Sequence, residues 1–202
     1  MTNLRVAVAK PDIGESELNL VSDAVKSGWI SSRGPYVTQF EKEFAEYVGV
    51  KHGVAVSSGT AALHLALLAL GIRPNSEVIV PSLTFVATAN SATYIGAKVV
   101  FADSHPDYWC VDPREIERRI TRKTGAIVVV HLYGHPCDMD RISDIAEKKN
   151  IPIIEDAAEA HGAEYKGQRV GSFGTIGCFS FFANKIITTG EGGICVTDDP
   201  LL

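Results

Sequence analysis

The chain has 202 residues, of which 46% are hydrophobic and 21% are charged, and its formal net charge is -5. This composition is that of an ordinary globular protein long enough to bury one substantial core, so we expect one domain. Charges of both signs are mixed along the chain, and no basic patch favours a nucleic acid as partner.

The four cysteines are widely spaced and form no CxxC pair; they are Cys110, Cys137, Cys178 and Cys195. We therefore expect buried, reduced thiols rather than disulfides or a zinc site. The first residues show no signal peptide, and no apolar stretch approaches the length of a membrane span. These features predict a cytoplasmic location.

The first quarter of the chain predicts an arm followed by two helices. Residues 1–15 are expected to be extended, and residues 16–27 to form a helix with one buried face, which Gly28 ends. Residues 29–35 are rich in small and turn-forming types, so they predict a loop. Apolar residues at helical spacing predict an amphipathic helix over 37–48.

The rest of the chain alternates short apolar strands with helices. Strands are expected at 53–56, 77–81, 98–103, 126–131, 151–155, 179–182 and 193–197, with helices at 61–70, 84–95, 112–120 and 139–149 and a glycine-rich hairpin over 162–177. This order predicts an α/β fold with a mostly parallel sheet and helices on both faces. In such sheets ligands bind at the carboxyl ends of the strands.

A small-residue turn joins the first strand to a helix that is apolar nearly all round, which we expect to be buried. A buried helix needs acceptors for its first amides, and a phosphate would supply them. Ser58, Gly59 and Thr60 are therefore the candidate phosphate ligands. The alternative is simple capping of the helix, which many α/β proteins share.

A single lysine, Lys185, lies within the run FSFFANKIITTGEGG over 179–193. Its apolar and small neighbours disfavour solvation of an ammonium group, which favours attack of the amine on a carbonyl and a Schiff base. The alternative is a surface lysine on a hairpin. An acidic run, EDAAE over 155–159, precedes it. An acid, a lysine and a small-residue turn before a helix are the groups that pyridoxal phosphate (PLP) needs.

Three stretches carry a family resemblance: Gly28–Ser32, Pro81–Asn90 and Asn184–Gly193. With them, the whole chain resembles the large domain of the DegT/DnrJ/EryC1/StrS family of PLP-dependent sugar aminotransferases, and most of all its perosamine-forming branch. The resemblance implies a three-layer fold of the type I PLP-dependent transferases over residues 1–202, without the family's smaller C-terminal domain. It also implies a homodimer.

The activity that the resemblance implies is transfer of an amino group from glutamate to a 4-keto sugar nucleotide, GDP-4-keto-6-deoxymannose. The product would serve surface polysaccharide or lipopolysaccharide O-antigen synthesis. A sugar dehydratase of the same family has histidine at the position of Lys185, so lysine favours transamination. The competing interpretation is a truncated relative that binds PLP without turnover. A dinucleotide-binding fold is disfavoured because no GxGxxG follows the first strand.

The resemblance also assigns roles to individual residues. Lys185 would hold the cofactor and transfer the proton, and Asp156 would face the ring nitrogen, or cap a helix in the next segment. Glu159 would approach the ring hydroxyl, or be a solvated charge. Phe85 would stack on the ring, or be ordinary core. Ser180, expected to point away from its two phenylalanine neighbours, would bind the phosphate.

Two histidines are candidate metal ligands by residue type. His131 and His135 are four apart but straddle a strand end and a turn, and no further ligand lies in register. We expect structural or substrate-proximal histidines and no metal. By resemblance the loop at 29–35 would approach the active site of a dimer; the alternative is a surface connection with a packed tryptophan.

Overall fold

The structure is a computed structural model and describes residues 10–202; most of the expected N-terminal arm lies outside these residues. The helices are α1 (Glu15–Ser27), α2 (Pro35–Val48), α3 (Gly59–Ala69), α4 (Val86–Tyr94), α5 (Pro113–Arg119) and α6 (Met139–Lys149), with a 3-10 turn at Leu132–Gly134. The strands are β1 (His52–Val56), β2 (Glu77–Pro81), β3 (Lys98–Ala102), β4 (Thr124–Val130), β5 (Ile153–Asp156), β6 (Glu164–Tyr165), β7 (Gln168–Arg169), β8 (Ile176–Ser180) and β9 (Gly193–Thr197).

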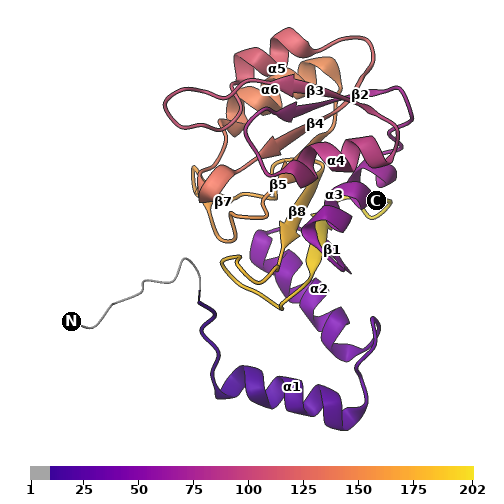
Figure 1. The fold of residues 1–202 in the computed structure, drawn as a ribbon, viewed down its shortest axis with the longest axis vertical. Helices are drawn as coiled ribbons and strands as arrows, with labels where there is room; N and C mark the ends of the chain where they lie inside the picture. The colour runs from indigo at the N-terminus through magenta and orange to yellow at the C-terminus, as the bar shows by residue number, and fades with distance from the viewer. Residues whose placement is uncertain (1–9) are drawn as a thin grey trace, which may run out of the picture.

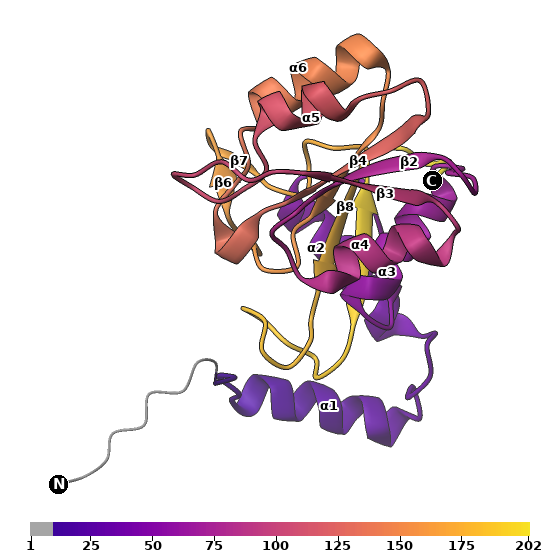
Figure 2. The same ribbon diagram turned by 45° about the horizontal axis from the view of Figure 1, so that its top comes forward.

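Seven strands form one sheet in the order β1-β9-β8-β5-β4-β2-β3. The strands from β8 to β3 run parallel, whereas β9 is antiparallel to both of its neighbours. Helices α3 and α4 cover one face, and α2, α5 and α6 cover the other (Figures 1 and 2). The predicted mostly parallel sheet between two helical layers is therefore confirmed.

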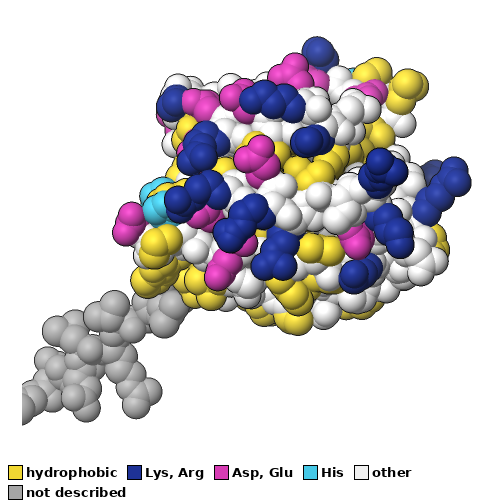
Figure 3. Space-filling model, turned by 90° about the horizontal axis from the view of Figure 1, so that it is seen from above, with side chains coloured by type: hydrophobic (Ala, Val, Ile, Leu, Met, Phe, Trp, Pro, Cys, Tyr) yellow, Lys and Arg dark blue, Asp and Glu magenta, His cyan; other side chains and the backbone are white. Residues whose placement is uncertain are grey.

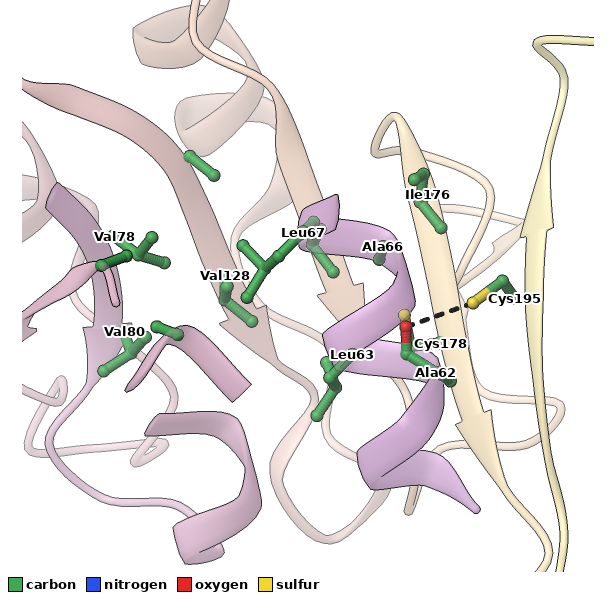
Figure 4. Packing of buried hydrophobic residues seen from close by; sticks show 14 residues of the cluster. Ala62, Leu63, Ala66, Leu67, Val78, Val80, Val128, Ile176, Cys178 and Cys195 are labelled. Atoms are coloured by element: carbon green, nitrogen blue, oxygen red, sulfur yellow. Dashed lines mark hydrogen bonds between the residues drawn. The ribbon is translucent and has the colours of Figure 1, made fainter. Parts of the chain in front are cut away.

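The core on the α3 side shows why this helix is not buried all round. Leu63 and Leu67 point into the apolar side chains of the sheet (Figure 4), and both are almost completely buried. On the opposite side of the helix, Leu65 and Leu68 are 38% and 51% exposed. The expectation of complete burial was wrong because α3 is packed on the sheet through one face only.

Helix α1 differs more strongly from its prediction. It extends over Glu15–Ser27 and ends at Gly28, whose φ of 79° is the left-handed conformation that glycine adopts readily. However, none of its residues is buried, and Leu18, Val21 and Val25 are each more than 60% exposed. The segment after Gly28 carries α1 away from both layers (Figure 1), so the described residues leave its apolar face uncovered.

The strand that contains the aromatic run also has different bounds. Sequence patterning placed it at 179–182, but β8 begins at Ile176 and ends at Ser180. Gly177 interrupts the apolar pattern at its start, and this glycine is required because a Cβ there would lie 2.3 Å from the carbonyl oxygen of Gly171. The remaining strands and helices lie within about three residues of their predicted bounds.

Charged side chains of both signs are interspersed on the face seen in Figure 3 rather than gathered by sign. On α5, for example, Glu115 pairs with both Arg118 and Arg119.

The four cysteines are free and buried, and residues 10–202 contain no metal-binding group of three or more His, Cys, Asp or Glu. Within the same residues, every helix is too short or too polar to span a membrane.

A buried histidine gives the fold a predicted pH dependence. His161 packs against the rings of Phe44, Phe179 and Phe181, and neither ring nitrogen has a hydrogen-bond partner among the described residues. Burial lowers the pKa of His161 to about 4. The unfolded chain therefore binds more protons between about pH 6.5 and pH 4, so stability falls as the pH falls through this window.

We expect the free energy of unfolding to drop by about 2 kcal/mol from pH 7 to pH 5 because of this group alone. Urea unfolding at the two pH values would measure the change. The variant His161→Phe, which keeps an aromatic ring at this place, should lose that share of the pH dependence. An unchanged dependence in the variant would contradict the assignment.

Candidate functional site

A pocket of about 290 Å³ opens at the carboxyl ends of β4, β5 and β8. It is lined by Gly59, Thr60, Leu63, Thr84, Phe85, Val130, Leu132, Asp156, Ala158, Glu159, Ser180, Phe182, Asn184 and Lys185. All but one of the candidate residues named from the sequence line this pocket; Ser58 adjoins it as the residue before Gly59.

The small-residue turn forms one end of the pocket. Ser58 is the N-cap of α3, and its hydroxyl oxygen accepts a hydrogen bond from the Ala61 amide at 3.1 Å. The amides of Gly59 and Thr60 belong to the first turn, so they have no acceptor within the helix. This end therefore combines capping by Ser58 with amides that suit an anion.

Ser180 lies against this turn from the end of β8. A Cβ on Gly59 would lie 2.6 Å from the Cβ of Ser180, so only glycine allows this approach. Ser180 is on the α3 side of the sheet, whereas Phe179 and Phe181 are buried on the α2 side. The opposite orientation of the serine and its neighbours agrees with the alternation of a strand.

Gly193 fixes the same turn from β9. A Cβ on Gly193 would lie 2.4 Å from both the carbonyl carbon and oxygen of Ser58. We expect Gly193→Ala to push the turn away from Ser180 and to lower the free energy of unfolding by roughly 1–3 kcal/mol. Urea unfolding would measure this loss. Gly14→Ala offers a comparison at a φ of -119°, which any residue adopts, where the atom nearest to the added Cβ is Glu17 Oε2 at 3.5 Å.

Asp156 ends β5 and points to the α4 side of the sheet. Its Oδ2 accepts from the Thr88 hydroxyl at 2.8 Å, and its Oδ1 accepts from the Ala158 amide at 3.2 Å. Burial raises the pKa of Asp156, while these hydrogen bonds and the charge of Lys185 act in the opposite direction. The segment after Asp156 forms a turn rather than a helix, so the alternative of a helix cap was wrong.

Lys185 reaches the pocket from the loop between β8 and β9. Its Nζ donates to Glu159 Oε1 at 3.1 Å, and its side chain is 14% exposed, unlike that of a surface lysine. Glu159 Oε2 accepts from the Tyr133 amide at 3.3 Å. The acid is therefore engaged rather than freely solvated, and the lysine has a carboxylate partner that the sequence did not reveal.

Phe85 is the N-cap residue of α4, and its side chain is exposed to solvent rather than buried. The residue is 71% exposed and lines the pocket, so the interpretation as core was wrong. An exposed aromatic ring at a pocket rim offers a flat surface for stacking. Its geometry permits the role that the resemblance implied.

Sequence reasoning missed the two threonines of the α4 region that lead to Asp156. Thr84 Oγ1 lies 3.0 Å from Thr88 Oγ1, which in turn contacts the aspartate. The available signal was their spacing of four residues at a helix start, which places both hydroxyls on one side. Thr88 is completely buried, so its hydroxyl needs the partner that it finds.

A second buried acid, Glu155, lies on the opposite face of β5. It is fully buried and accepts from His131 Nε2 at 2.9 Å and from the amides of Gly171, Phe173 and Gly174. The other ring nitrogen of His131 accepts from the Cys137 amide at 3.1 Å, so Nε2 carries the proton. His131 is thus structural, as one of the sequence interpretations proposed.

Comparison with known proteins places this pocket in a family. Residues 11–202 match the model of the DegT/DnrJ/EryC1/StrS aminotransferase family. GDP-perosamine synthase of Escherichia coli O157:H7 is 51% identical over 98% of this chain and 54% of its own length. GDP-perosamine synthase of Caulobacter vibrioides is 52% identical over 96% of this chain and 53% of its own length.

A solved structure agrees with this grouping. The PLP-form of Spr1654 from Streptococcus pneumoniae superposes with a TM-score of 0.92 at 37% identity, covering 98% of this chain and 54% of that chain. The chain spans about half the length of the curated relatives it matches.

Proposed function

This chain belongs to the DegT/DnrJ/EryC1/StrS aminotransferase family, whose cofactor is PLP, and on that premise we propose that it is the cofactor-binding part of a sugar aminotransferase. The amino donor is glutamate and the acceptor is a 4-keto sugar nucleotide, GDP-4-keto-6-deoxymannose. The identity of about half of all positions to two GDP-perosamine synthases supports this substrate. The product would enter a surface polysaccharide such as the O-antigen.

The observation that carries the proposal is the meeting of three groups in one pocket. Lys185, Asp156 and the first turn of α3 come from distant parts of the chain and line the same cavity. Asp156 is buried, and its hydrogen-bond donors among the described residues are neutral. Such a carboxylate is suited to a cation from the pocket, which a protonated ring nitrogen would supply.

The residues present therefore fit PLP. The amides of Gly59 and Thr60, with Ser58 and Ser180, would hold its phosphate; Phe85 would cover the ring, and Lys185 would bind its aldehyde carbon. When bound, the cofactor withdraws electrons from the carbon that carries the amino group.

The protein's own chemistry centres on Lys185. Its amine is the basic group placed to move a proton at the substrate carbon, once it is no longer bonded to the cofactor. Glu159 holds Nζ at 3.1 Å and so fixes the direction from which the proton is delivered. Asp156 balances the positive charge on the far side of the pocket. Phe182 and Leu132 line the walls and limit the access of water.

We place the enzyme in the cytoplasm and expect a homodimer. Four free cysteines suit a reducing compartment. The exposed apolar side of α1 is a surface that a second copy could cover. Gel filtration at several protein concentrations would test the dimer.

Borohydride trapping tests the proposed site directly. The chain would be mixed with PLP, reduced and digested, and the modified peptide identified by mass spectrometry. We expect the label on Lys185 and none in Lys185→Ala, whereas Lys166→Ala, which removes a lysine paired with Asp140 at the surface, should be labelled as the wild type is. Labelling elsewhere would overturn the assignment.

The alternative, a relative that binds PLP without turnover, has its own test. Glutamate added to the PLP-loaded chain should give 2-oxoglutarate, and a panel of keto sugar nucleotides should then identify the acceptor. Trapping on Lys185 without any release of 2-oxoglutarate would favour the non-catalytic interpretation.

A further inference from the structure

A short line of hydroxyl groups connects the rim of the pocket to the buried carboxylate of Asp156. Thr84 lines the pocket, its Oγ1 lies 3.0 Å from Thr88 Oγ1, and Thr88 Oγ1 lies 2.8 Å from Asp156 Oδ2. Thr88 and Asp156 are both buried, whereas Thr84 is only partly buried. The line therefore runs from an accessible hydroxyl to an inaccessible acid.

The direction of these hydrogen bonds follows from the charge at the inner end. An ionised carboxylate only accepts, so the single hydroxyl proton of Thr88 is directed at Asp156. The oxygen of Thr88 must then accept from Thr84, whose proton is committed in the same direction. Aligned hydroxyls polarise one another, so Thr84 strengthens the bond that Thr88 makes.

The backbone around Thr88 adds to this arrangement. Thr88 is the third residue of α4, which begins at Val86, so the hydrogen bond to the carboxylate comes from the first turn of that helix, at its positive end. The amide of Ala158 donates to the other oxygen of Asp156. Each oxygen of the acid thus has one neutral donor fixed by the fold, and its remaining lone pairs are free for the pocket.

The other ionisable groups around Asp156 do not replace these donors. Lys185 acts on the carboxylate through charge alone, since its Nζ makes no hydrogen bond to it. His131 is neutral, because its Nδ1 accepts from the Cys137 amide, and its Nε2 donates to Glu155 instead. Cys178 is its register partner on β8 and is a buried thiol. Glu155 precedes it on β5 but points to the other face, where the amides of the 171–174 turn bind it.

We propose that Thr88, supported by Thr84, is a positioning residue that keeps Asp156 ionised and turned toward the pocket despite its burial. The hydroxyl holds one oxygen on the α4 side, which fixes the plane of the carboxylate and leaves it ready to accept a hydrogen bond from a cationic ligand. The benefit of this arrangement rests on the proposed function, because it needs a protonated ring nitrogen in the pocket.

The test measures the ionisation of Asp156 in the full chain without cofactor. Aspartate labelled with ¹³C at the side-chain carboxyl would be titrated by NMR, and Asp156→Asn would assign the resonance. Thr88→Val removes the hydroxyl donor and should raise the pKa of Asp156. We expect the carboxyl to bind its proton roughly tenfold more tightly than in the wild type. Thr84→Val, which leaves the direct bond in place, should shift it in the same direction by less.

Two control variants separate positioning from general destabilisation. Thr88→Ser retains the hydroxyl and should keep the pKa of Asp156 near that of the wild type. Thr93→Val makes the same change at an exposed threonine of α4 whose hydroxyl bonds to Asn90 instead, and should leave the titration unchanged. If Thr88→Val does not fold, the shift in Thr84→Val decides the question.

An unchanged titration of Asp156 in both Thr88→Val and Thr84→Val would overturn the proposal. Equal shifts in Thr88→Ser and Thr88→Val would also overturn it, because packing rather than the hydroxyl would then be responsible. Neither result bears on PLP trapping at Lys185. Failure of the proposed positioning role of Thr88 and failure of the proposed function therefore remain distinguishable.

Discussion

Replacing Glu155 by alanine is expected to lower the free energy of unfolding by roughly 3–5 kcal/mol, the cost of removing one member of a buried charged network. The loss would leave the amides of Gly171, Phe173 and Gly174 and the Nε2 proton of His131 without their acceptor. These donors are buried or partly buried, so water cannot fully replace the carboxylate. Urea unfolding followed by circular dichroism would measure the change.

Two variants sharpen this experiment. Glu155→Gln keeps the volume and one acceptor oxygen but turns an amide donor toward backbone donors, so we expect a smaller loss of roughly 1–3 kcal/mol. Glu147→Ala removes an exposed glutamate on α6 and should change stability by less than about 0.5 kcal/mol. A Glu155→Ala protein as stable as Glu147→Ala would contradict the network's proposed importance.

The order of strands and helices was predictable because the apolar residues are local in sequence and bounded by turn-forming types. Strands β2 and β9 and helix α6 have the predicted bounds. The burial of α1 could not be predicted in the same way. Its apolar spacing indicates that one side suits a partner surface, but spacing does not identify which surface lies opposite it.

In the candidate site, too, residues with a local sequence signal were predictable and contacts between distant segments were not. Lys185, Asp156 and the Ser58 turn could be named because each carries a local signal, and strand ends in a parallel sheet converge. The partnership of Lys185 with Glu159 depends on how the loop after β8 folds back, which no local pattern encodes. Thr88 was missed because a threonine within a helix is common, and only its buried contact with Asp156 distinguishes it.

Replacing Asp156 by asparagine is expected to slow amino transfer from glutamate roughly a hundredfold or more, while PLP is still trapped on Lys185. The variant keeps the size of the side chain but removes its charge, and in a buried site a charge attracts a cationic partner strongly. Loss of one such preorganised electrostatic contact typically costs about 10²–10³-fold in rate. Rapid mixing of the PLP-loaded chain with glutamate would measure the rate from the absorbance of the cofactor.

The matched control is Asp103→Asn, which makes the same change beyond the end of β3. Asp103 accepts from the Ser82 hydroxyl and the Ser104 amide at an exposed position, and it does not line the pocket. We expect its rate to equal that of the wild type, so a difference between the two variants isolates the charge inside the pocket. Equal rates for Asp156→Asn and the wild type would show that this carboxylate does not stabilise a cationic group in the pocket, and its assignment to the ring nitrogen would then be wrong.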